Sequence, residues 1–217
     1  MKVLFIFIAA LFFISCSGEA SRDGRDHSSM NHNSTTTNAV DHSQMDHGSM
    51  DHSKMVSSPG AKDAPQELQF IDTMIAHHKG AIEMAKLVNG RTENATLKKF
   101  ADGIINAQDR EVTEMMRWRG KWFEGKPAAI NMDFPGMQEG MGGMDMSKLT
   151  AAKGPEFDLE FISQMIPHHQ GAIKMADALK AGKQYGDLTN LAAVIKKDQS
   201  AEIEQMKKWQ TEWAKTP

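Results

Sequence analysis

Histidine and methionine recur at fixed separations in this sequence, and both side chains are ligands for soft or borderline metal ions. The 217-residue chain has 17 Met and nine His against a single Cys. The pentapeptide Asp-His-x-x-Met occurs four times, at residues 26–30, 41–45, 46–50 and 51–55. A period of five residues fits neither a helix nor a strand, so packing does not explain the spacing. Imidazole together with thioether suits copper, and the thioether favours Cu(I).

The pentapeptides belong to a polar segment, residues 16–62, that has hardly any apolar residue other than Met. Such a segment cannot bury enough surface to fold, so we expect a disordered N-terminal tether. The alternative to metal capture is a low-complexity linker grown by repeat slippage, because such tracts are assigned by composition alone. The candidate copper ligands of this tail are His27, Met30, His42, Met45, His47, Met50, His52 and Met55.

A second set of His and Met residues lies in an internal duplication. Residues 67–122 align with residues 158–213 without a gap, and 20 of the 56 pairs are identical. Both copies keep an adjacent His pair, its flanking Met residues, and a Glu and a Met in the second half. A core histidine held by polar partners is the structural alternative to a metal site. The candidate ligands are Met74, His77, His78, Met84, Glu111 and Met115 in the first copy, and Met165, His168, His169, Met175, Glu202 and Met206 in the second.

The identical positions of each copy are three or four residues apart, which predicts two helices per copy. Asp63 is the expected N-cap of the first helix, and Asn89 with Gly90 its expected end. Thr92 or Asn94 is expected to begin a second helix of roughly 28 residues. Each copy is therefore predicted to be a helical hairpin.

One hairpin has a single apolar face to bury, so the fold class is all-α, a four-helix bundle of two duplicated hairpins over residues 63–217. In the first hairpin, Gln108 is expected opposite the pair His77 and His78, with Glu111 one turn away. Adjacent helix residues point about 100° apart. We therefore expect one His of each pair to face the bundle centre and the other the surface or the neighbouring helix.

The connector between the hairpins, residues 126–154, has five Met among glycines. Gly and Pro disfavour a regular helix there, so core packing does not explain these methionines. We expect an open, flexible thioether site for Cu(I), with a hydrophobic lid over one end of the bundle as the alternative. The candidate ligands are Met137, Met141, Met144 and Met146.

The first 15 residues are an apolar run after Lys2, too short to span a bilayer and typical of a signal peptide. Cys16 follows at once and resembles the lipid-carrying first residue of a mature bacterial lipoprotein. Phe13 departs from the usual Leu of that signal, so an ordinary secretory signal is the alternative. We expect an exported protein, lipid-anchored at Cys16 on the periplasmic face of the outer membrane or the cell surface.

The block Met-Ile-x-His-His-x-Gly-Ala-Ile-x-Met-Ala, at residues 74–85 and again at 165–176, resembles the DUF305 family. That resemblance implies an exported, ferritin-like four-helix bundle with copper binding and a role in copper resistance or trafficking. It also implies that Met and His of the two blocks are ligands. It does not extend to the pentapeptide tail or to Cys16.

The expected function is that of an envelope lipoprotein, not an enzyme, that sequesters or traffics Cu(I) or Cu(II) and contributes to copper and silver tolerance. Its partners would be copper ions and other envelope copper-handling proteins. The balance of 25 Lys and Arg against 28 Asp and Glu argues against nucleic acid. The alternatives are a ferritin-like metal-dependent oxidase, although the sequence has no Glu-x-x-His, and a helical partner-binding module with incidental His and Met.

If Cys16 carries the lipid, Cys16→Ala should release the protein from membranes, because a secreted chain without acyl groups has no anchor at this position. Fractionation of cells that express either form measures the change. Membrane retention of Cys16→Ala would show that lipidation is not the anchor.

Overall fold

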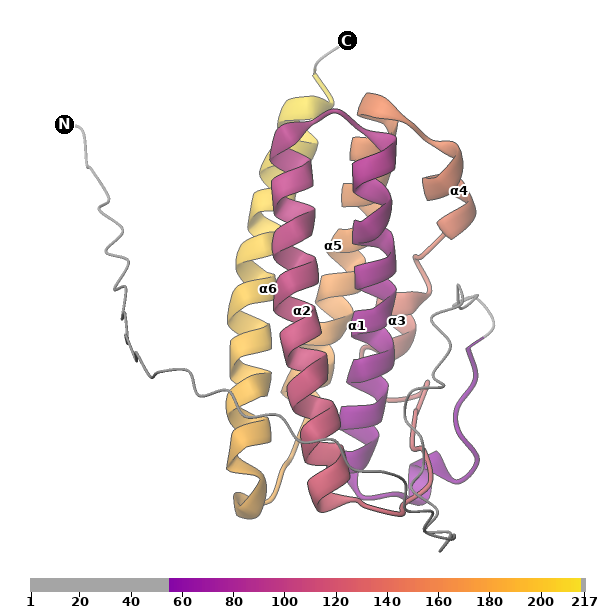
Figure 1. Cartoon of the computed structure of the whole chain (residues 1–217), viewed down its shortest axis with the longest axis vertical. Coiled ribbons are helices and arrows are strands. Elements are labelled where there is room, and N and C mark those ends of the chain that lie inside the picture. Colours follow the sequence, from indigo (N-terminus) through magenta and orange to yellow (C-terminus); the bar gives the residue numbers. More distant parts are fainter. Residues whose placement is uncertain (1–54, 216–217) are drawn as a thin grey trace, which may run out of the picture. The chain divides into compact units, whose positions relative to one another are not determined.

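The computed structural model describes residues 55–215; the leader, Cys16 and the tail ligands from His27 to His52 lie outside this range. The described residues contain helices and no strand. Four long helices form the bundle: α1 (Gln66–Arg91), α2 (Ala95–Trp122), α5 (Gly154–Ala178) and α6 (Gly186–Trp213) (Figure 1). Helix α1 packs against α2, α5 packs against α6, and α1 also contacts α5. The predicted all-α fold of two hairpins is confirmed.

The helix ends differ from the prediction at α1 and agree with it at α2. Asp63 belongs to a separate 3-10 turn, η3 (Ala61–Asp63), and Pro65 is the residue at the N-cap of α1. Helix α1 continues through Asn89 and Gly90, because the N–H of Thr92 still donates to the carbonyl of Val88. Asn94, one of the two predicted starts, caps α2, and that helix has 28 residues. None of the described helices is long and apolar enough to cross a bilayer.

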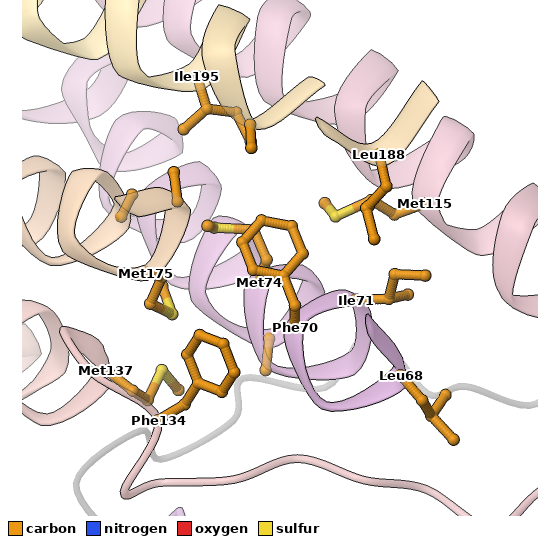
Figure 2. Packing of buried hydrophobic residues seen from close by; sticks show 14 of the residues in the cluster. Leu68, Phe70, Ile71, Met74, Met115, Phe134, Met137, Met175, Leu188 and Ile195 are labelled. Carbon is orange, nitrogen blue, oxygen red and sulfur yellow. The ribbon is translucent and has the colours of Figure 1, made fainter. Parts of the chain in front are cut away.

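The core has two apolar clusters, and each draws on both repeats. The first includes Met74 and Met115 of the first repeat with Met175 of the second (Figure 2). Met74 precedes the first His of its pair by three residues, whereas Met175 follows its own by seven. Their shared cluster therefore requires α1 and α5 to run antiparallel. The second cluster has the equivalent composition, with Met165, Met206 and Met84.

The connector is packed, which corrects the expectation of an open thioether site. It contains two short helices, α3 (Met137–Met141) and α4 (Met146–Ala151). Met137 and Met141 are buried in the first cluster, so core packing does explain part of the Met excess. Met144 and Met146 are partly buried against the second cluster. The connector covers the side of the bundle formed by α1 and α5, where α3 and α4 lie beside these helices (Figure 1).

Close backbone contact between α3 and α5 holds the connector in place. A Cβ on Gly171 would lie 2.5 Å from the Cα of Gly140 and 2.6 Å from the carbonyl oxygen of Gly136. Only glycine allows backbones to approach this closely. Lys174 of α5 also donates to Glu139 of α3 at 3.1 Å. That hydrogen bond lowers the pKa of the Glu139 carboxyl, which stays ionised at neutral pH.

The start of the described chain is attached to the same connector. The N–H of Ser58 donates to the carbonyl of Ile130 at 2.8 Å, and the N–H of Met132 donates to Oγ of Ser57 at 2.9 Å. Met55, the last residue of the pentapeptide tail, packs against the first cluster. The described chain therefore begins beside the first cluster, where Met137 and Met141 of the connector are also buried.

Gly171→Ala should destabilise the protein by about 1–3 kcal/mol, because the added methyl group overlaps backbone that cannot move without displacing α3. Gly103→Ala in α2 is the matched control, since a Cβ there meets nothing within 4 Å. Urea denaturation followed by circular dichroism measures both. Equal stabilities of the two variants would contradict the glycine contact.

Candidate metal centre

Two histidine rings meet at the centre of the bundle. His77 on α1 and His168 on α5 occupy equivalent positions of the two repeats, and both side chains are fully buried. Their ring centroids are 3.8 Å apart, with planes tilted by 37°. Two imidazolium charges at this separation would repel strongly in a buried site. The contact therefore disfavours simultaneous protonation of both rings.

The second histidine of each pair faces the neighbouring helix. His78 Nε2 is 2.7 Å from Oε2 of Glu111 on α2, and His169 Nε2 is 2.7 Å from Oε2 of Glu202 on α6. The ring centroids within each pair are 6.3 Å apart, so the two rings of a pair diverge. The predicted division of each pair between the bundle centre and the neighbouring helix is confirmed.

Gln108 was expected opposite the histidines, but the side chain that contacts His78 is the carboxylate of Glu111. Helical side chains lean toward the N-terminus of their helix, so the longer Glu111 reaches back by one turn. Gln108 is buried, and its Oε1 has no hydrogen-bond partner among the described residues. Gln199 repeats this arrangement in the second hairpin.

The carboxylates determine which ring nitrogen keeps a lone pair. When a carboxylate oxygen of Glu111 accepts from Nε2 of His78, the neutral tautomer of that ring carries its lone pair on Nδ1. Nδ1 of His78 is buried without a hydrogen-bond partner in the described part of the chain, and so is Nδ1 of His169. A carboxylate that holds the far side of an imidazole is the usual support of a metal-ligating histidine. Glu111 and Glu202 are thereby placed as orienting partners of the histidines.

The six helix methionines that the sequence singled out are fully buried, three in each cluster. Figure 2 shows Met74, Met115 and Met175 together in the first cluster. The sequence did not predict that each cluster combines methionines of both repeats. Met74 and Met84 flank the same His pair in the sequence and were therefore grouped as candidate ligands of one copy. The seven residues between His77 and Met84 could have indicated the separation, since they place Met84 two turns along the helix from His77.

Carboxylates do not form a polydentate site here. Between residues 55 and 215, no three side chains of His, Cys, Asp or Glu cluster closely enough to hold a metal ion. A di-iron site of the ferritin-like type needs several inward Glu and two Glu-x-x-His pairs. The chemistry that the described residues offer at the centre is that of imidazole and thioether, which suits soft and borderline ions.

Comparison with known proteins identifies a family and several solved structures. Residues 67–210 match the DUF305 family model, described as a domain of unknown function. The structure of CopM in its Cu(II)-bound form is 42% identical, with a TM-score of 0.58, and the match covers 68% of this chain and 97% of that one. CopM in its Cu(I)-bound form is 39% identical, with a TM-score of 0.57, and the match covers 68% and 96%.

Two further proteins are also similar. A DUF305 protein from Streptomyces coelicolor is 27% identical, with a TM-score of 0.59, and the match covers 69% of this chain and 94% of that one. A curated relative, an uncharacterized protein of Acanthamoeba polyphaga mimivirus, is 40% identical over 47 residues, which are 22% of this chain. The match spans 31% of that relative's length.

Glu111→Ala should lower the free energy of unfolding by about 1–3 kcal/mol, because it leaves Nε2 of the buried His78 without its acceptor. Glu114→Ala, three residues away, removes an exposed ion pair with Arg117 and should change stability by about 0.5 kcal/mol or less. Urea titration of both variants tests the comparison. A Glu111→Ala variant as stable as Glu114→Ala would rule out the structural importance of the buried pair.

Proposed function

The chain belongs to the DUF305 family, and we propose that it is an exported protein that binds copper ions and buffers them or passes them on. The observation that carries this proposal is the repeated set of two divergent histidines at the bundle centre, each second one oriented by a glutamate. Imidazole and thioether side chains are buried at equivalent positions of both repeats. CopM, to which the chain is similar, has been solved with Cu(I), Cu(II) and silver bound.

We propose Cu(I) as the favoured ion. Thioethers are soft ligands that select Cu(I), and silver shares this preference. His78 and His169 supply the harder nitrogen ligands that Cu(II) also accepts. In this proposal Met74, Met115 and Met175 serve one end of the centre, and Met84, Met165 and Met206 serve the other.

The tail and the leader extend the proposal beyond the bundle. The pentapeptides of residues 26–55 would capture copper through their imidazole and thioether ligands. Export by the leader and lipidation at Cys16 would hold this capture segment in the cell envelope.

Anaerobic titration of the mature protein with Cu(I) against a chromogenic chelator should give more than two ions per chain. Deletion of residues 17–54, which spares the hydrogen bonds of Ser57 and Ser58, should lower that number. The double variant Met115→Leu and Met206→Leu should lower the number or the affinity again, because leucine fills the same volume without a sulfur atom. Met116→Leu is the matched control, since Met116 is 42% exposed beside the buried Met115.

Failure of the mature protein to compete for any Cu(I) would overturn copper binding. Equal binding by the double variant and Met116→Leu would exclude the buried thioethers as ligands and leave the imidazoles and the tail.

A further inference from the structure

A short helix of the connector lies directly over the centre of the bundle. Helix α3 packs on α5 and also contacts α1 (Figure 1). A Cβ on Gly140 of α3 would overlap Nε2 of His77, and it would lie 3.2 Å from the carbonyl oxygen of His168. The backbone of α3 therefore lies against the His77 ring, which in turn contacts the ring of His168. Helix α3 covers this ring pair where it faces the connector.

The histidine rings are closed off from solvent, so something has to move before a molecule from outside can touch them. All four side chains of the two His pairs are fully buried. The four long helices are held together at this level by the two apolar clusters and by the two histidine–glutamate pairs. The element that moves is therefore expected outside the four long helices, and α3 is the one that contacts a ring.

Helix α3 has the features of a segment that unfolds locally. It has five residues, and a helix this short gains few hydrogen bonds against the cost of fixing its backbone. Those bonds include the N–H of Gly140 to the carbonyl of Gly136 at 2.9 Å and the N–H of Gly142 to the carbonyl of Gln138 at 2.7 Å. Gly136, with a φ of 96°, precedes the helix, and Gly142 and Gly143 follow it. Glycines on both sides allow the backbone to change direction there.

Different contacts hold the two faces of α3. Met137 and Met141 are buried in the first apolar cluster. Over the histidines, the contact with α5 consists of glycine backbone at Gly171 and the ion pair of Glu139 with Lys174, whose side chains are 57% and 56% exposed. An exposed ion pair contributes little to stability. Opening would uncover the two methionines, so the open state is a minor population in exchange with the closed one.

We propose that α3 is a lid that opens by local unfolding while the four long helices stay packed, and that ions and small molecules reach His77 in this open state. The use of the lid for copper rests on the proposed copper binding, whereas its opening does not. An ion enters and leaves through the same open state. A tighter lid therefore slows loading and release by the same factor and leaves the affinity unchanged.

The first test closes the lid covalently. Glu139→Cys and Lys174→Cys are introduced into the mature chain with Cys16→Ser. Because the paired side-chain atoms of residues 139 and 174 are 3.1 Å apart, a short bis-maleimide can join the two thiols. The same protein with both thiols capped by N-ethylmaleimide is the matched control. The cross-link should slow acylation of His77 by diethyl pyrocarbonate, and hydrogen exchange of the Gly140 amide, by about tenfold or more.

The second test loosens the lid. Glu139→Gln keeps the size of the side chain and removes the charge that pairs with Lys174. It should raise the acylation rate of His77 and the exchange rate of the Gly140 amide by about two- to fivefold, the range that an exposed ion pair allows. Glu114→Gln, which breaks the exposed ion pair with Arg117 on α2, is the control and should change neither rate.

The third test measures copper kinetics on the cross-linked and capped proteins. Anaerobic stopped-flow mixing with Cu(I) gives the loading rate, and mixing of the loaded protein with a chromogenic chelator gives the release rate. Both rates should fall by about tenfold or more in the cross-linked protein, while the affinity changes by less than about twofold.

The outcomes separate the lid from copper binding. Equal acylation of His77 in the cross-linked and capped proteins would refute the lid, and so would no acylation of His77 in the capped protein until urea unfolds the bundle. The rings would then be reached by another way, such as past Glu202, which is 23% exposed beside His169. Unchanged loading of Cu(I) by a cross-linked protein would refute α3 as the entrance for copper. If the chain binds no Cu(I), the proposed copper binding fails, and the first two tests still decide whether α3 opens.

Discussion

Burial of four imidazole rings at one level of the bundle imposes conditions that the surrounding helices have to meet. Each buried polar ring costs free energy unless its nitrogen atoms find partners. Helices α1 and α5 bring His77 and His168 into contact, while α2 and α6 each supply one carboxylate, to His78 and His169. A shift of one turn within either hairpin would break a histidine–glutamate pair. The polar contacts at the centre therefore specify the register of the helices that surround them.

Each buried methionine fills space in the apolar core and also has a potential metal-ligand atom. Leucine would fill the two clusters as well, but it would offer no ligand atom, and cysteine would be smaller and reactive. The flexible thioether packs without needing a hydrogen bond and still has a soft lone pair. Met74, Met115 and Met175 are therefore packed as apolar core residues although each has a sulfur lone pair.

The connector breaks the symmetry that the duplication creates. Two hairpins with equivalent His pairs would form equivalent sites if nothing else touched them. Glycine backbone lies over one repeat at Gly171, and the Met144 side chain lies over the other at Gly80. A single connector that follows only the first hairpin cannot treat both repeats alike. The surroundings of the two halves therefore differ because of a segment outside the duplicated sequence.

Periodicity and capping in the sequence by themselves determined the four long helices, a start of α2 at Thr92 or Asn94, the length of α2 and the division of each His pair between two directions. These features depend on residues close together in the chain or on the 100° turn per residue. Only the tertiary structure decided that Met175 joins Met74, that Met137 and Met141 are buried, and that α1 continues past Gly90. Contacts between distant segments cause the first two, namely the antiparallel packing of α1 and α5 and the backbone contact of α3 at Gly171. Asn89 and Gly90 were predicted to end α1, but the helix continues past them because the N–H of Thr92 still donates to the carbonyl of Val88.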